Sequence, residues 1–147
     1  MVVLLLKGGY TLTELIKIVT RYADYRVIKG YSRDFFPNKP SFHLELITGK
    51  NKGEIIDIHL KDLKAVFFVK DFIGKPSYNE RKYFMEGQHI TGRKVKVSFK
   101  DGEVLVGSTV GYDPKRQGFF FFPADSESNN LKIFAVMSAV SKVEFLR

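Results

Sequence analysis

The feature that most constrains this chain is a repeat within its own sequence. A shift of 77 positions places residues 17–70 on residues 94–147 without a gap. The two copies keep a turn aspartate, a glycine and a proline at matching places, in the pairs Asp24/Asp101, Gly30/Gly107 and Pro37/Pro114. Their apolar positions also coincide over most of that length. A chance alignment would not keep all of these together, so we expect two copies of one supersecondary unit.

The second copy has the pattern of short β-strands. Residues 94–100 alternate polar and apolar side chains, as a strand with one buried face does. Asp101 and Gly102 then predict a tight hairpin turn, because glycine accepts the positive φ that such a turn needs. Gly107 and Gly111 are interpreted as places where the sheet bends. The expected strands are residues 94–100, 103–112, 119–122, 131–137 and 140–146.

The repeat predicts matching strands in the first copy, at residues 17–22, 26–32, 42–48, 54–60 and 63–69. Tyr25 stands where the second copy has its turn glycine. A capping pattern that begins at Thr11 favours a short helix to about Ile16. The apolar residues 1–6 are predicted to add a strand at a sheet edge, with an exposed interaction strand as the alternative.

The expected fold is therefore mainly β, with two tandem small β-barrel repeats, a short N-terminal helix and a connector. The first repeat is assigned to residues 1–72, the connector to 73–92 and the second repeat to 93–147. Copies of roughly 50 residues lie near the lower limit for an independent core. We therefore expect the two repeats to dock on each other as a pseudo-symmetric pair.

These residues resemble two known patterns. The run from Val95 through Asp101-Gly102 to Gly107, with the phenylalanines at 119–122, resembles the first motif of the Sm-like small β-barrel. That resemblance implies Sm-like or SH3-like barrels. The chain is also similar to an uncharacterised bacterial domain family of unknown function, through Asp34-Phe35-x-Pro37, Phe42-His43-Leu44 and residues 62–72. The second resemblance implies a fold and a bacterial source, but no activity.

The RNA pocket that the Sm resemblance implies is not reproduced. Sm-like RNA-binding proteins carry an Asp…Asn pair before the third strand and an Arg-Gly pair before the fifth. Here Gly118 holds the Asn position, and Met137-Ser138 or Leu60-Lys61 replaces the Arg-Gly pair. We therefore expect the barrel architecture without the uracil-binding groups, and a fold alone does not supply a function.

The residue types that catalysis needs are few and scattered. There is no cysteine, which excludes a disulfide, a thiolate nucleophile and a zinc finger. His43 aligns with Phe120, so it is interpreted as a structural or surface residue, with ligand contact as the alternative. His59 is expected to face solvent, and His89 carries no signal. With no phosphate loop or paired carboxylates, we expect a non-enzymatic protein with no cofactor and no metal ion.

The formal net charge of +8 attracts phosphates, so single-stranded RNA or DNA binding is one hypothesis. The charge is spread over both copies, however, and most phenylalanines are expected in the core. The arginine motif of PilZ barrels, which bind cyclic diguanylate, is not matched by Arg21 and Arg26, which are one residue too far apart.

We therefore predict an interaction or regulatory module that contacts a protein partner through barrel loops and edge strands. A homo-oligomer is left open. The residues predicted to contact the partner lie in two equivalent loops and combine aromatic rings with cations: Phe35, Phe36, Lys39, Tyr112, Lys115 and Arg116. No apolar run reaches the length of a membrane helix, so the expected location is the cytoplasm.

Overall fold

The computed structural model describes residues 15–147 and is built almost entirely from antiparallel strands. We call β1–β5 the first half: β1 (Ile16–Tyr22), β2 (Val27–Ser32), β3 (Ser41–Leu46), β4 (Ile55–His59), the 3-10 helix η1 (Leu60–Asp62) and β5 (Leu63–Val69). The second half has β6 (Arg93–Phe99), β7 (Val104–Thr109), β8 (Gly118–Pro123), β9 (Asn130–Val136), η2 (Met137–Ala139) and β10 (Val140–Phe145). The mainly β prediction is confirmed, and every strand expected from the repeat has an observed counterpart.

The shift that aligns the two sequence copies also aligns their elements. β6, β7, β8 and η2 begin and end 77 positions after β1, β2, β3 and η1. The turn after the first strand of each half contains one residue with positive φ, Tyr25 at 75° and Gly102 at 94°. The backbone therefore turns in the same way in both halves, although glycine adopts a positive φ much more readily than tyrosine does.

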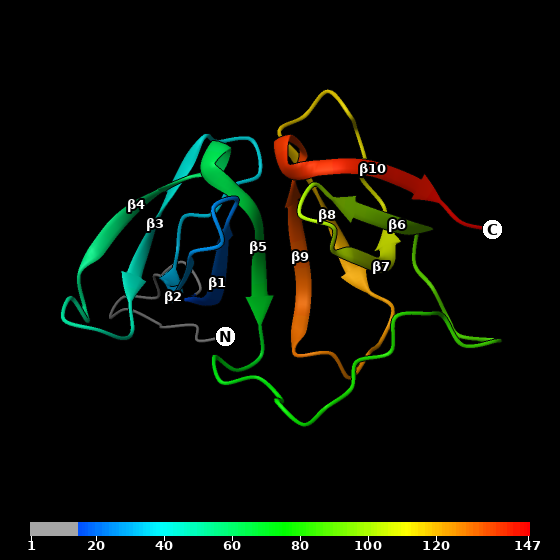
Figure 1. Ribbon diagram of the computed structural model, residues 1–147, viewed down its shortest axis with the longest axis horizontal. Helices are drawn as coiled ribbons and strands as arrows, with labels where there is room; N and C mark the ends of the chain where they lie inside the picture. The colour runs from blue at the N-terminus through cyan, green and yellow to red at the C-terminus, as the bar shows by residue number, and fades with distance from the viewer. Residues whose placement is uncertain (1–14) are drawn as a thin grey trace, which may run out of the picture.

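All ten strands belong to one open sheet, in the order β10-β6-β7-β8-β9-β5-β1-β2-β3-β4. The expectation of two tandem barrels is therefore not supported as stated. The reason is a pairing across the halves, which we call the β5–β9 joint: Ala65 lies opposite Ala135, and Phe67 lies opposite Ile133. Figure 1 shows β5 and β9 side by side between the two halves. Within residues 15–147, β4 and β10 end the sheet, and we call them the free edges.

The joint is part of the hydrophobic core, because β5 is buried along its whole length. Val66 and Phe68 pack into the apolar cluster of the first half, whereas Ala65, Phe67 and Val69 pack into that of the second half. In return, β9 inserts Phe134 and Val136 into the first cluster. Full burial of a Val or Phe side chain contributes about 1.5–3 kcal/mol, so these crossing residues hold the halves together.

The N-terminal helix expected up to Ile16 is wrong where the structure describes it. Ile16 begins β1 and lies opposite Ser32 of β2. Strand pairing on both sides of β1 outweighs the local helical preference. The rest of that helix, residues 11–14, and the edge strand expected at residues 1–6 lie outside the described residues. Over residues 15–147 no helix is long and apolar enough to cross a membrane.

The connector between the halves is attached to the β8–β9 loop. Asn129 Nδ2 donates to the Asp71 carbonyl at 2.9 Å, and the Asp125 carboxylate accepts from the Tyr78 hydroxyl at 2.5 Å and from the Arg81 backbone N–H at 2.9 Å. The hydrogen bond from Tyr78 is the main reason that the pKa of Asp125 falls to about 2, and the same bond raises the pKa of Tyr78 to about 12. These bonds hold the connector on the second half.

Candidate functional site

Two loops that are equivalent under the 77-position shift contact each other across the halves. Residues 33–40 join β2 to β3, and residues 110–117 join β7 to β8; we call them the paired loops. Gln117 Nε2 donates to the carbonyl oxygens of Pro37 and Lys39, at 2.7 Å each. One side chain of the second half therefore holds the backbone of the first-half loop. The loops that the sequence singled out do lie together in space.

Four of the six predicted contact residues are exposed on the paired loops. The Phe36 ring is 47% exposed, and the Lys39 ammonium lies 5.7 Å from its centroid. Lys115 and Arg116 are exposed on the other loop, where Arg116 Nε lies 3.6 Å from the Asp113 carboxylate. Together they present one aromatic ring and three cations.

The other two predicted contact residues, Phe35 and Tyr112, are half-buried packing residues. Phe35 makes edge-to-face contacts with Phe42 and Phe134, at centroid distances of 5.1 and 5.3 Å. The Tyr112 ring lies 4.9 Å from that of Phe119. Such contacts stabilise aromatic pairs beyond simple area burial. Phe35 and Tyr112 therefore anchor the loops, while the surface offered to a partner comes from the other four residues.

A surface hollow of about 450 Å³ opens where the loops meet. Pro37, Tyr112 and Arg116 lie around it, and Phe119, Phe120 and Phe134 are among its lining residues. The lining combines these apolar residues with the charged side chains of Asp113 and Arg116, so the hollow is suited to a group that has both an apolar and a polar part.

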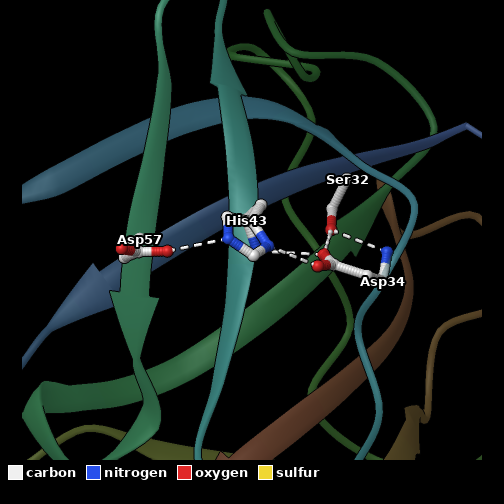
Figure 2. A network of polar contacts seen from close by, with 4 residues as sticks. All are labelled: Ser32, Asp34, His43 and Asp57. Atoms are coloured by element: carbon white, nitrogen blue, oxygen red, sulfur yellow. Dashed lines mark hydrogen bonds and ion pairs between the residues drawn. The ribbon is translucent and has the colours of Figure 1, made fainter.

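A second polar group, which the sequence did not predict, surrounds His43 on β3 (Figure 2). Its Nδ1 lies 2.5 Å from Asp34 Oδ2, and its Nε2 lies 2.9 Å from Asp57 Oδ1 on β4. The His43 backbone N–H also donates to Asp34 Oδ1, at 2.9 Å, and the Ser32 hydroxyl donates to the same oxygen at 3.2 Å. The imidazole thus bridges two carboxylates from different elements.

The electrostatics of this group favour a charged imidazole. The hydrogen bond to Asp34 raises the pKa of His43 above its ordinary value of 6.5, and the negative charges of Asp34 and Asp57 act in the same direction. Partial burial raises the pKa of the Asp34 carboxyl, but the hydrogen bonds and charge of His43 outweigh it, and the net shift is downward. Both shifts show that the contact favours the charged forms of the two groups.

The contacts around His43 are not those of a nucleophilic triad. In such a triad the imidazole accepts the serine proton and the carboxylate holds the opposite ring nitrogen. Here the Ser32 hydroxyl donates to Asp34, and the second ring nitrogen of His43 faces Asp57. Ser32 is also only 2% exposed. The arrangement therefore does not activate a serine. Across residues 15–147, no cluster of three His, Cys, Asp or Glu side chains is placed to hold a metal ion.

Sequence reasoning placed His43 on a strand but missed its partners. The signal that could have found them is the register of the β3–β4 pair, in which His43 lies opposite Asp57. Asp34 was noticed only within a motif, because its contact with His43 depends on the path of the loop between β2 and β3.

Comparison with known proteins identifies a family but no characterised relative. No curated protein and no solved structure matches the chain. One family model matches residues 15–147, which is the whole described part of the chain. The chain therefore belongs to a family of unknown function (DUF6982).

Proposed function

We propose that the protein is a non-enzymatic interaction module of the bacterial cytoplasm that binds a protein partner through the paired loops. The observation that carries this proposal is the double hydrogen bond from Gln117 to Pro37 and Lys39, which joins two distant loops into one surface. Connecting loops that are held by a rigid scaffold are common binding elements.

The strand order supports an interpretation of the two halves as merged Sm-like or SH3-like units. The first half has the order β5-β1-β2-β3-β4, and the second half has the corresponding order β10-β6-β7-β8-β9. On this interpretation each half supplies its β2–β3-type loop to the same surface. Duplication would thus have produced a two-loop binding surface that neither half offers alone.

The chemistry of the surface indicates the kind of segment that it binds. Phe36 offers an exposed ring with the Lys39 ammonium beside it, and Lys115 and Arg116 add positive charge on the other loop. Aromatic residues and arginine are enriched among the residues that dominate binding energies in protein interfaces. We infer that the partner presents an acidic segment with an apolar side chain that enters the hollow beside Tyr112.

The test is affinity capture from a cell extract, compared between the wild type and the quadruple variant F36A/K39A/K115A/R116A. A matched control, K50A/N51A/K52A, removes exposed charge from the β3–β4 turn. We expect proteins that bind the wild type and the control but are lost from the quadruple variant. An identical set of captured proteins with all three chains would overturn the proposal.

Single-stranded nucleic acid is the second candidate, because the chain carries a formal charge of +8 and Phe36 could stack on a base. This hypothesis predicts gel retardation of an oligonucleotide at about 50 mM salt that falls steeply as salt rises. The F36A variant should then weaken retardation at constant charge. Absence of retardation at low salt would exclude this candidate and leave the protein partner.

A further inference from the structure

We propose that charged side chains on the two free edges, β4 and β10, prevent further copies of the chain from adding to the sheet, so that the protein is a monomer. This inference depends on the β5–β9 joint and not on the paired loops. It can therefore fail or hold independently of the proposed partner-binding function.

The joint shows how one half docks on another. Under the 77-position shift, β5 corresponds to β10 and β9 corresponds to β4. The β10 edge of one molecule and the β4 edge of the next could therefore repeat the joint from molecule to molecule. Contacts of that head-to-tail kind produce rings or filaments, and exposed sheet edges promote such pairing. The side chains on the free edges decide whether this happens.

On the β4 side, an aromatic pair of the joint is replaced by an ion pair. In the second half Phe120 lies opposite Phe134, with ring centroids 5.0 Å apart, and both pack against the first half. At the same positions of the first half, His43 lies opposite Asp57, with Nε2 and Oδ1 2.9 Å apart (Figure 2). The polar group around His43 thus occupies the face that corresponds to the docking face of the second half.

At a third position on the β4 side, an apolar residue of the joint is again replaced by a polar one. Val136 of β9 is buried in the first-half cluster, whereas its counterpart at the end of β4 is the exposed His59. All three apolar docking positions therefore become polar at the free edge.

On the β10 side, Ala65 and Phe67 of the joint are replaced by Lys142 and Glu144. The Lys142 ammonium lies 2.8 Å from Glu144 Oε1, and Lys96 approaches the same carboxylate at 3.9 Å. The alternate positions of the strand remain apolar, since Val143 and Phe145 pack on the second-half cluster. Charge therefore appears only on the face of β10 that would meet another molecule.

A joint-like contact between two molecules would bury the Lys142–Glu144 ion pair against apolar side chains. In the register of the joint, Lys142 would lie opposite Ile58, and Glu144 would lie opposite Ile56. Neither isoleucine can form a hydrogen bond with a charged group through its side chain. Removing an ion pair from water costs more free energy than its mutual attraction returns unless further hydrogen bonds satisfy both groups, so this burial opposes association. The edges are thus unfavourable to a copy of this chain, even though their backbones match the joint.

The test restores the side chains of the joint on one edge at a time. The β4-edge variant is H43F/D57F/H59V, and the β10-edge variant is K142A/E144F. Each variant alone should stay monomeric in light scattering after size exclusion, because its other edge keeps the native charges. Mixed together, the two should form a complex with one molecule of each, at least about 100-fold tighter than any self-association of the wild type. All five substitutions in one chain should produce larger oligomers.

A matched control places apolar groups elsewhere. The variant K115F/R116A should not associate with the β4-edge variant. If it did associate, the pairing would reflect nonspecific hydrophobic association and not the joint. Folded variants that fail to pair when mixed would overturn the proposal. So would a wild type that forms oligomers at micromolar concentration, a result that needs no variant. If the triple variant does not fold, D57L mixed with the β10-edge variant replaces it and should associate more weakly, whereas no association would count against the proposal.

Discussion

The ammonium of Lys64 on β5 lies 2.6 Å from the carboxylate of Asp101, in the turn between β6 and β7. Lys64 is only 8% exposed, and its Nζ also lies 2.5 Å from Glu103 Oε1 and 4.9 Å from the centroid of the Phe99 ring. A buried cation of the first half is thus neutralised entirely by groups of the second half.

This geometry predicts an asymmetry between two kinds of substitution. In D101N/E103Q the Lys64 charge stays buried without a counter-charge, so we expect the free energy of unfolding to fall by on the order of 2 kcal/mol. This loss is smaller than for a fully buried ion pair, because the Glu103 side chain is partly exposed. K64M removes the charge and keeps the packing, so we expect a change within about 1 kcal/mol. Urea denaturation of both variants measures the difference. A larger loss for K64M than for the double variant would contradict this account.

Gly107 on β7 is expected to tolerate no side chain, whereas Gly111 is expected to tolerate one. A Cβ at Gly107 would lie 2.0 Å from the Phe122 carbonyl oxygen, and a Cβ at Gly111 would meet nothing within 4 Å. Because the obstacle is backbone, G107A should lower the free energy of unfolding by about 2–4 kcal/mol. G111A should change it by less than about 0.5 kcal/mol. Thermal or urea unfolding of the pair is the measurement, and equal effects would refute the close approach of β7 and β8.

Tyr25 is expected to be a poor residue for its own position. Its φ of 75° lies in the left-handed region, where the matching turn of the second half has Gly102 at 94°. The left-handed conformation costs a non-glycine residue about 1–2 kcal/mol, and the greater flexibility of an unfolded glycine offsets part of that. Y25G should therefore raise the free energy of unfolding by about 0.5–1 kcal/mol, and G102A should lower it. A destabilising Y25G would show that the exposed ring contributes more than the turn does.

The ion pairs of His43 predict a stability that depends on pH. Because the pKa of His43 is raised in the folded state, its contribution is fully present below the ordinary value of 6.5 and is lost as pH rises through the raised value. The lowered pKa of Asp34 acts at the acidic end, where its contribution is lost as pH falls below 3.8 through the lowered value.

The measurement is urea unfolding of the wild type and H43Q from pH 5 to 9. The wild type should lose stability relative to H43Q as pH rises above 6.5, and the resonances of His43 should show its pKa raised above that ordinary value. If the free energy of unfolding depended on pH in the same way for both proteins, His43 would not be the source of the pH dependence.

Much of the strand layout could be predicted because the two copies support each other. The apolar alternation of residues 94–100 located β6, and the shift then located β1 against a local helical pattern. Tyr25 could be recognised as a turn residue only through its alignment with Gly102. Local propensity alone would have missed both features.

The joining of the halves into one sheet could not be predicted from the repeat. Repeats describe what the copies share, whereas the joint depends on where they differ, at Ala65, Phe67 and Phe134. A signal was present in the unbroken apolar run over most of residues 63–69, since a strand buried on both faces lacks alternation. The site was harder to predict than the fold. Gln117 binds loop carbonyl oxygens, and Asp34 itself lies on a loop, so both contacts depend on a loop path that the packing of Phe35 and Tyr112 sets.

The two-sided burial of β5 has a consequence for how the chain is made. A ribosome produces β5 before any part of the second half exists, and β9 ends only at Val136. Throughout that interval Phe67 and Val69 have no second half to cover them, and the paired edge of β5 lacks its partner strand. Partly made chains with such apolar edges are prone to aggregate. The nascent protein therefore passes through a period of exposure that the finished protein does not have, and this period lasts until β9 has been made and has paired with β5.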